Sequence, residues 1–184
     1  FSLFLVLISI LLSFFINGQT PGDIHSNTSL IRNFSPQNYG ANPQTFSSVQ
    51  DHRGIIYIAC QQGVLEYDGV SWKLIKTGNT VLKLAISEKG IIYVLCKKDF
   101  GILEVGPTGT FYFKSMLDLF GQFKNASFDK FKEIVFFGKS RYVLTSDQLY
   151  RITGNQVTQI PTGGTVELIQ KNENDLFVQI EGKG

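Results

Sequence analysis

Short runs of β-branched and aromatic residues recur along the chain, and each run ends at a turn signal that contains Gly, Asp or Gln. The clearest series predicts strands over 45–50, 55–60, 64–67 and 71–76, separated by turns at 51–54, 61–63 and 68–69. Runs of this length bounded by Gly and Asp-Gly are typical of antiparallel strands joined by hairpins. Four such strands in succession make one blade of a β-propeller.

The same series returns further along the chain. Tyr57 is followed 36 residues later by Tyr93, and weaker copies place Tyr142 and Phe177 at the corresponding points, 85 and 120 residues after Tyr57. A period of roughly 35 to 50 residues with several strands per unit is typical of propellers and other stacked arrays, in which no unit buries its apolar faces alone. We therefore predict an all-β fold, an incomplete β-propeller of about three and a half four-stranded blades.

The repeats divide the chain into segments. A lead-in over 19–44, with a ring-closing strand expected near 29–34, precedes the blades. Blade 1 is predicted over 45–80, blade 2 over 81–116, blade 3 over 117–161 and the first half of blade 4 over 162–184. Between 115 and 132 the alternation breaks down and apolar residues take spacings nearer to a helical face, which predicts a short helix or an ordered loop at the start of blade 3.

The N-terminal segment has a different character. Residues 1–16 are almost entirely apolar, and the run ends at the polar segment 17–22. A membrane span needs about 20 apolar residues, whereas a secretory core needs roughly 7 to 15. Residues 1–18 are therefore interpreted as a signal peptide cleaved after Gly18, so that the mature chain begins at Gln19. An uncleaved N-terminal anchor is the alternative interpretation.

Composition agrees with blades and argues against nucleic acid as a partner. Hydrophobic residues make up 43% of the chain and charged residues 17%, against a usual charged share of about 25%, which suits strands covered on both faces. Lys and Arg number 17 and Asp and Glu number 15, giving a net charge of +2. This balance gives no electrostatic footprint for nucleic acid.

Candidate catalytic chemistry is sparse. His25 lies in the lead-in and His52 in a turn, so they form no pair at metal-ligand spacing. Cys60 and Cys96 occupy equivalent places in successive repeats, and neighbouring blades are related by a large rotation. Because a disulfide needs Cα atoms within about 7 Å, we expect both cysteines to be buried free thiols. No glycine loop that cradles phosphate and no nucleophile elbow occurs. The sequence predicts no catalytic residue, metal or cofactor, and a region that is not an enzyme.

The glycines that recur in the repeats are interpreted as structural. Positive φ angles at hairpins are expected at Gly54, Gly63, Gly69, Gly90 and Gly101. The β-branched and aromatic residues between them suit a half-buried or fully buried pleat.

The best repeat resembles a known family. The resemblance is to the two-component regulator propeller repeat. That repeat reads loosely as Val before Gln-Asp, a Gly, an aromatic strand, and Gly-Leu-x-x-Tyr-Asp-Gly with an aromatic after it. The matching residues here are 38–51, 53–57, 63–69 (Gly-Val-Leu-Glu-Tyr-Asp-Gly) and Ser71-Trp72. The match is tight over 38–73, fair in the second repeat and one of spacing beyond. Many family repeats carry Trp and a Gly-Thr pair where this chain has Tyr57 and Ala59-Cys60.

The resemblance implies the N-terminal periplasmic sensor region of a Bacteroidetes hybrid two-component or triple-tyrosine-motif regulator. Such proteins combine two seven-bladed propellers, a triple-tyrosine sandwich domain, a membrane span and a histidine kinase or DNA-binding output domain. It thus implies an extracytoplasmic part of an inner-membrane protein. The implied partners are a small-molecule or oligosaccharide ligand and the remaining blades and downstream domains of the same chain, with a homodimer left open.

A ligand is expected at the turns between the second and third strands of each blade, because such loops lie on one rim of a rigid scaffold. The second repeat carries a two-residue insertion there that combines paired cations with an aromatic, which suits an acidic or sugar-like ligand. The candidate ligand-binding residues are Gln61, Gln62, Lys97, Lys98, Asp99 and Phe100. The alternative is a solvated turn with Phe100 packed between blades.

Three functions remain open on the sequence. The leading hypothesis is a sensing module that binds a ligand, with a carbohydrate as the candidate class, and relays the signal to downstream domains. A secreted scaffold or adhesion propeller without signalling output is the second. The third is a propeller-based polysaccharide-degrading enzyme, which would need acid and base residues that converge from separate blades.

Overall fold

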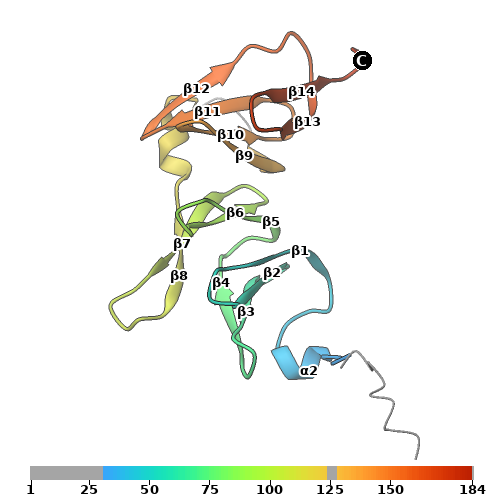
Figure 1. Cartoon of the computed structure of the whole chain (residues 1–184), viewed down its shortest axis with the longest axis vertical. Coiled ribbons are helices and arrows are strands. Elements are labelled where there is room, and N and C mark those ends of the chain that lie inside the picture. Colours follow the sequence, from blue (N-terminus) through green and yellow to red (C-terminus); the bar gives the residue numbers. More distant parts are fainter. Residues whose placement is uncertain (1–30, 124–127, 184) are drawn as a thin grey trace, which may run out of the picture. The chain divides into compact units, whose positions relative to one another are not determined.

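The computed structural model describes residues 31–123 and 128–183 (Figure 1). The chain divides into two compact units, Phe1–Asn33 and Phe34–Gly184, and all the strands and helices given below belong to the second. The predicted signal peptide over 1–18, its cleavage site and the lead-in up to residue 30 lie outside the described residues. No helix in the described part is long and apolar enough to cross a membrane.

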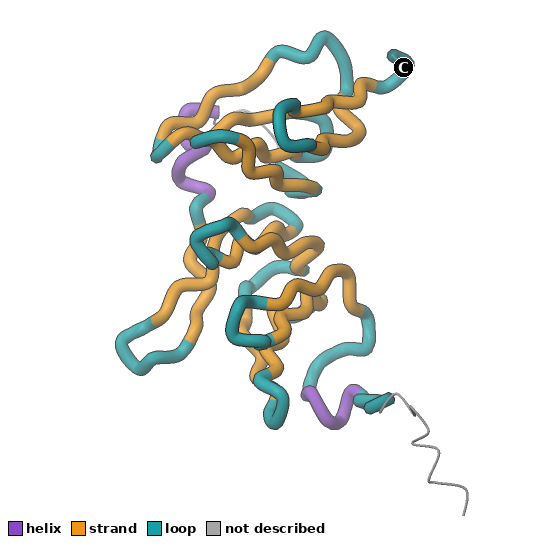
Figure 2. The backbone as a smooth tube through the Cα atoms, in the orientation of Figure 1, coloured by secondary structure: helices purple, strands orange, loops and turns teal. Residues whose placement is uncertain are grey.

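The second unit is built from antiparallel sheets in which successive strands are neighbours (Figures 1 and 2). The first sheet contains β1 (Thr45–Gln50), β2 (Ile56–Cys60), β3 (Gly63–Tyr67) and β4 (Trp72–Lys76). The second contains β5 (Val81–Ile86), β6 (Ile92–Cys96), β7 (Phe100–Val105) and β8 (Phe111–Ser115). The third contains β9 (Glu133–Phe137), β10 (Ser140–Leu144), β11 (Leu149–Thr153) and β12 (Gln156–Ile160), and a two-stranded sheet pairs β13 (Val166–Lys171) with β14 (Leu176–Ile180).

These sheets are propeller blades, and the predicted fold class, an incomplete all-β propeller, is confirmed. The first strands of neighbouring blades pack together, since β1 contacts β5 and β9 contacts β13. Between β5 and β9 the link is an ion pair of Lys83 with Glu133. Strand order and the contacts of the first strands therefore match a meander repeated around an axis.

Three apolar clusters lie between neighbouring blades, and a smaller one around Cys60 and Leu65 lies within blade 1. One cluster joins Tyr57 of β2 to Val94 of β6, and both side chains are fully buried. A second joins Phe100 of β7 to Ile152 of β11, and a third joins Leu144 of β10 to Ile169 of β13. Because each of the three larger clusters draws on two neighbouring blades, these blades depend on one another for burial of their faces.

Two short helices flank the blades. A 3₁₀ helix, η1 (Leu117–Phe123), lies where a helix or ordered loop was expected, and its Phe120 is buried against Tyr150 at a ring distance of 5.3 Å. The strand expected near 29–34 is wrong for the described residues 31–34, which form no strand. The chain instead forms α2 (Pro36–Tyr39). Pro36 suits the first turn of a helix, and Gly40, in the αL conformation, suits its C-terminal end.

Cys60 and Cys96 are fully buried free thiols, as expected. Burial raises the pKa of the Cys96 thiol to about 12, and the Cys60 Sγ donates to the Gly63 carbonyl at 3.3 Å. We predict that a thiol reagent will not label the native protein and will titrate two thiols after unfolding without reductant, because a buried neutral thiol is unreactive. Absence of free thiols in the unfolded protein would contradict this.

Four of the five repeat glycines have the expected positive φ. The angles are 85° at Gly54, 147° at Gly63, 96° at Gly69 and 76° at Gly90. The expectation is wrong for Gly101, which does not have a positive φ and lies inside β7. A Cβ at Gly101 would come within 2.2 Å of the Lys114 carbonyl oxygen, so this position needs glycine for close approach of two strands.

Gly69 offers a test of the hairpin between β3 and β4. Its surroundings are open, so only its left-handed backbone resists a side chain. We expect Gly69→Val to cost about 1 to 3 kcal/mol, whereas Lys73→Ala at an exposed position of β4 should stay within about 0.5 kcal/mol. Thermal unfolding should be compared in the extended protein, meaning a chain that continues through the blades that close the ring. Equal shifts in melting temperature would refute the role of Gly69.

Candidate functional site

The predicted site lies at the turns between the second and third strands of blades 1 and 2. In the first of these turns the side chains of Gln61 and Gln62 hold the loop before β1. The Asn42 side chain donates to Gln61 Oε1 at 2.8 Å and its backbone N–H to Gln62 Oε1 at 2.9 Å. Gln61 Nε2 donates to Gln44 Oε1, also at 2.8 Å. Both glutamines therefore have a role within the blade.

Phe100 is fully buried, and the interpretation that places its ring between blades is the correct one. The ring stacks on Phe131 at a centroid distance of 5.5 Å and on Tyr93 at 6.1 Å. Asp99 stabilises the same turn, since its Oδ1 accepts from the Phe100 N–H and the Ser115 hydroxyl, each at 2.7 Å. The expectation that Phe100 meets a ligand is wrong, because the insertion directs this aromatic into the core.

Lys97 and Lys98 are held by their backbones and keep exposed side chains. The Lys97 N–H donates to the Thr80 carbonyl at 2.9 Å, and the Lys98 N–H to the Asp129 carbonyl at 3.2 Å. Lys98 is a non-glycine residue with positive φ, 64°. That the side chains of Lys97 and Lys98 contact a ligand stays a prediction.

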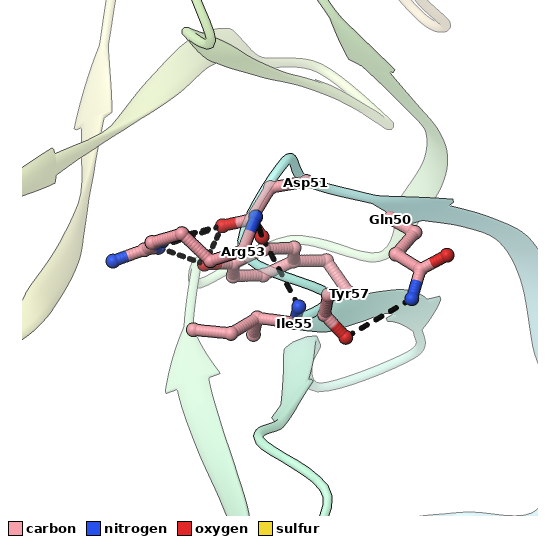
Figure 3. A network of polar contacts seen from close by, with 6 residues as sticks. Gln50, Asp51, Arg53, Ile55 and Tyr57 are labelled. Atoms are coloured by element: carbon pink, nitrogen blue, oxygen red, sulfur yellow. Dashed lines mark hydrogen bonds and ion pairs between the residues drawn. The ribbon is translucent and has the colours of Figure 1, made fainter.

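The turns between the first and second strands carry a different set of groups. In blade 1, Asp51 sits at the start of this turn and both its oxygens are used (Figure 3). Its Oδ1 accepts from the N–H groups of Arg53 and Ile55, at 2.9 and 3.1 Å. Its Oδ2 accepts from Arg53 Nε at 2.9 Å, from Arg53 Nη2 at 2.7 Å and from the Tyr57 hydroxyl at 3.4 Å. One carboxylate thus joins a guanidinium to a buried phenol.

This network shifts the pKa of its members. Burial acts to raise the pKa of Asp51, but hydrogen bonds from the Arg53 side chain and from the backbone of Ile55 and Arg53 outweigh it, so the pKa is lowered. Burial, with the negative charges of Asp51 and Glu66, raises the pKa of Tyr57 to about 12. The ion pair is therefore fully charged and the phenol neutral at pH 7.

Asp51→Asn should reveal this linkage. We expect a loss of about 1 to 3 kcal/mol at pH 7, because the buried charge-assisted bonds are weakened. Since the folded pKa lies below the unfolded one, the carboxylate stabilises the fold above the unfolded pKa, and this contribution is lost as the pH falls through the folded value. The variant should therefore lose less stability than the parent between neutral and acid pH. Asp175→Asn, at an exposed turn, is the control, and equal acid sensitivity of parent and Asp51→Asn would contradict the assignment.

Blade 2 has the same turn without the carboxylate. Ser87 occupies the place of Asp51, because the Ser87 N–H donates to the Ile91 carbonyl at 3.0 Å and the Ile91 N–H donates to Ser87 Oγ at 3.1 Å. In blade 1, Asp51 and Ile55 form the same two bonds at 3.0 and 3.1 Å. Ser87 therefore replaces Oδ1 of the aspartate and has no counterpart of Oδ2.

The tyrosine of blade 2 finds its guanidinium in blade 3. The Tyr93 hydroxyl, at the place of Tyr57, accepts from Arg141 Nη1 of β10 at 3.2 Å. The Arg141 guanidinium carbon lies 5.9 Å from the centre of the Tyr93 ring, and Nη2 donates to the Gly154 carbonyl. Lys89 stands in the sequence where blade 1 has Arg53. Blades 1 and 2 thus share a phenol and a guanidinium, and they differ in the carboxylate.

A hollow of about 1140 Å³ opens at this point. It is bordered by the β5–β6, β9–β10 and β13–β14 turns. Four cations and two carboxylates line it together with apolar side chains. The lining residues are Ser87, Glu88, Lys89, Ile91, Tyr93, Phe136, Phe137, Gly138, Lys139, Ser140, Arg141, Lys171, Asn172 and Glu173. Within the described residues, no group of three or more His, Cys, Asp or Glu side chains could hold a metal ion.

Sequence reasoning missed this set of residues. They come from three blades, and the later repeats are too weak to align turn by turn. The signal that could have found them is the change from Asp51 to Ser87 at one register position. The hollow lies at the first-to-second-strand turns, whereas the expected site lies at the second-to-third-strand turns.

No protein-family model and no curated protein matches the sequence. Solved structures match the fold. The extracellular domain of the putative one-component system BT4673 from B. thetaiotaomicron, also described as a hybrid two-component system, aligns with TM-scores of 0.53 and 0.52 at 16% identity over 73% of this chain. YCF48 from Cyanidioschyzon merolae aligns with a TM-score of 0.54 at 14% identity over 75% of this chain.

The chain spans about a fifth of the BT4673 domain, 19% and 18% in its two structures, and 48% of YCF48. At these identities the likeness is one of fold. It agrees with the propeller architecture that the repeats predict, and it includes a domain of the kind of regulator that the resemblance implies.

Proposed function

We propose that this chain is part of the extracytoplasmic ligand-sensing propeller of a membrane-bound two-component or transcriptional regulator. The single observation that carries the proposal is the hollow at the first-to-second-strand turns, in a fold shared with the extracellular domain of BT4673. The family resemblance of residues 38–73 supports the same assignment. In this proposal the region itself has no catalytic activity, and later domains of the protein produce the output.

The composition of the hollow suits a polar ligand of several rings. Its volume of about 1140 Å³ exceeds that of common small-ligand pockets, which hold roughly 300 to 1000 Å³. Arg141 and the lysines can bind hydroxyl or acidic groups, while Phe136 and Phe137 offer apolar faces. Because three blades contribute turns, a ligand there would bear on the relative placement of the blades, which is the kind of change that a sensor must pass on.

The test joins binding to output. The extended protein is screened by thermal unfolding against defined neutral and acidic oligosaccharides, and the full-length protein is assayed in cells with a transcriptional reporter. We expect at least one oligosaccharide to raise the melting temperature by a few degrees (about 2 to 4 °C) and to change reporter output. Arg141→Gln should abolish both effects.

Other outcomes separate the alternatives. Binding without any change in reporter output would overturn the sensor and favour a scaffold or adhesion propeller. Shortened products from the oligosaccharide would reveal a polysaccharide-degrading enzyme. Binding that survives Arg141→Gln unchanged would place the ligand elsewhere, and the exposed Lys97 and Lys98 would then be the next residues to replace.

A further inference from the structure

The first turn of blade 1 contains a carboxylate that has no counterpart among the side chains of the blade 2 turn at the hollow. There a carboxylate oxygen, Asp51 Oδ2, is shared between the Arg53 guanidinium and the Tyr57 hydroxyl. The guanidinium and the hydroxyl also touch each other, at 3.1 Å. A phenol and a guanidinium in contact thus make a seat for one carboxylate oxygen.

Blade 2 has the same pair of a phenol and a guanidinium, but the guanidinium comes from blade 3. Tyr93 and Arg141 are 3.2 Å apart, close to the separation of Tyr57 and Arg53. Ser87 forms with Ile91 the two bonds that Asp51 forms with Ile55, but it brings no second side-chain oxygen. Both Tyr93 and Arg141 line the hollow, so the seat opens toward a space that a ligand can enter.

We propose that the hollow binds a ligand through a carboxylate placed between Tyr93 and Arg141, as the Asp51 carboxylate is placed in blade 1. This inference rests on the proposed function, since it names the ligand class of the same site. The ligand is an acidic oligosaccharide, one that carries a uronic acid. Tyr93 donates its hydroxyl hydrogen to the carboxylate, and Arg141 supplies charge-assisted N–H donors.

The surrounding charges support an anion at this point. Lys89 stands where blade 1 has Arg53, Lys139 lies in the β9–β10 turn of blade 3, and Lys171 ends β13 of blade 4, all three at the border of the hollow. Glu88 and Glu173 offset part of this charge and leave an excess of two cations. A single negative group therefore enters a site with unbalanced positive charge, as electrostatic complementarity requires.

A sugar accounts for the rest of the lining. A lone carboxylate would occupy a small part of about 1140 Å³. Ile91, Phe136 and Phe137 add apolar surface on which the C–H face of a pyranose ring can pack. Backbone and side-chain donors and acceptors of Ser140 and Asn172 can take hydroxyl groups. A carboxylate on a sugar chain uses both parts of the hollow.

The first experiment compares ligands that differ in one charge. Calorimetric titration of the extended protein uses trisaccharides of galacturonic acid and of glucuronic acid, each beside its methyl ester. At least one of the free acids should bind, and its ester should bind about tenfold more weakly or not at all. Equal affinity of acid and ester, or no binding of either acid, would overturn the proposal.

The second experiment moves the carboxylate from the ligand to the protein. Ser87→Asp restores the residue of blade 1 and should fill the seat from within, so that acid affinity falls about tenfold or more while the melting temperature holds or rises. Ser87→Asn, of nearly the same shape without the charge, should reduce affinity much less. Equal effects of the two substitutions would contradict a carboxylate seat.

Arg141→Gln completes the set, with Arg151→Gln on the exposed face of β11 as the matched control. The first should abolish acid binding, and the second should leave it unchanged. If Arg141→Gln lowers the melting temperature but not acid affinity, Arg141 only ties blades 2 and 3 together and the proposal fails. If neutral trisaccharides bind and change reporter output, the sensing function stands and the carboxylate site is refuted. If the acids bind without a change in reporter output, the carboxylate site stands and the sensing function is refuted.

Discussion

Gly101→Ala should destabilise the second blade by about 3 to 5 kcal/mol in the extended protein. Gly101 lies inside β7 and pairs with Ser115 of β8. A Cβ there would come within 2.2 Å of the Lys114 carbonyl oxygen and within 2.6 Å of the Phe113 ring. The ring can rotate, but the carbonyl belongs to a ladder of backbone hydrogen bonds and can move only if β7 and β8 separate.

Gly121→Ala is the matched control. Gly121 lies in η1 without a positive φ and has no neighbour within 4 Å of an added Cβ, so we expect an effect within about 0.5 kcal/mol. Chemical unfolding of the two variants measures the difference. A small effect at both glycines would mean that β7 and β8 are not as close as their pairing requires, and the strand register around Ser115 would have to change.

The fold was predictable because its signal is periodic. Strand 45–50 was placed at its observed bounds, and the others of blade 1 within one residue, since Gly and Asp-Gly turns bound them. Gly101 was misread for a local reason. A glycine two residues after a turn looks the same whether it bends the chain or lets two strands approach, and only the partner strand decides between these roles.

The site was less predictable, since it depends on contacts between repeats. The insertion at 97–100 indicates a change in the turn, but nothing in the sequence tells whether Phe100 points to solvent or into the core. Arg141 and Tyr93 are 48 positions apart, and their contact follows from the packing of blade 3 on blade 2. The change from Asp51 to Ser87 at a single register position was visible, yet its meaning required the geometry of both turns.

Residues 19–184 expressed alone should aggregate or melt early and bind no ligand. In the described chain the fourth sheet contains only β13 and β14, whereas each of the other three has two further strands. Phe177 is 55% exposed and Leu168 38% exposed. Leu176, Val178 and Ile180 are half-buried. In the other blades a third strand pairs with the second, so the outer edge of β14 presents backbone donors and acceptors beside apolar side chains, a combination that favours association between chains.

The extended protein should behave differently, because a third and fourth strand would pair with β14 and the following blade would cover Phe177. We expect it to be monomeric or a defined oligomer in light scattering, and to unfold in one cooperative transition. The comparison needs only the two chain lengths at equal concentration. The hollow at the first-to-second-strand turns includes Lys171 and Asn172 from the incomplete sheet, so ligand binding should appear together with the added strands. A monomeric, cooperatively melting fold of residues 19–184 would contradict the open propeller and favour a smaller closed β-architecture.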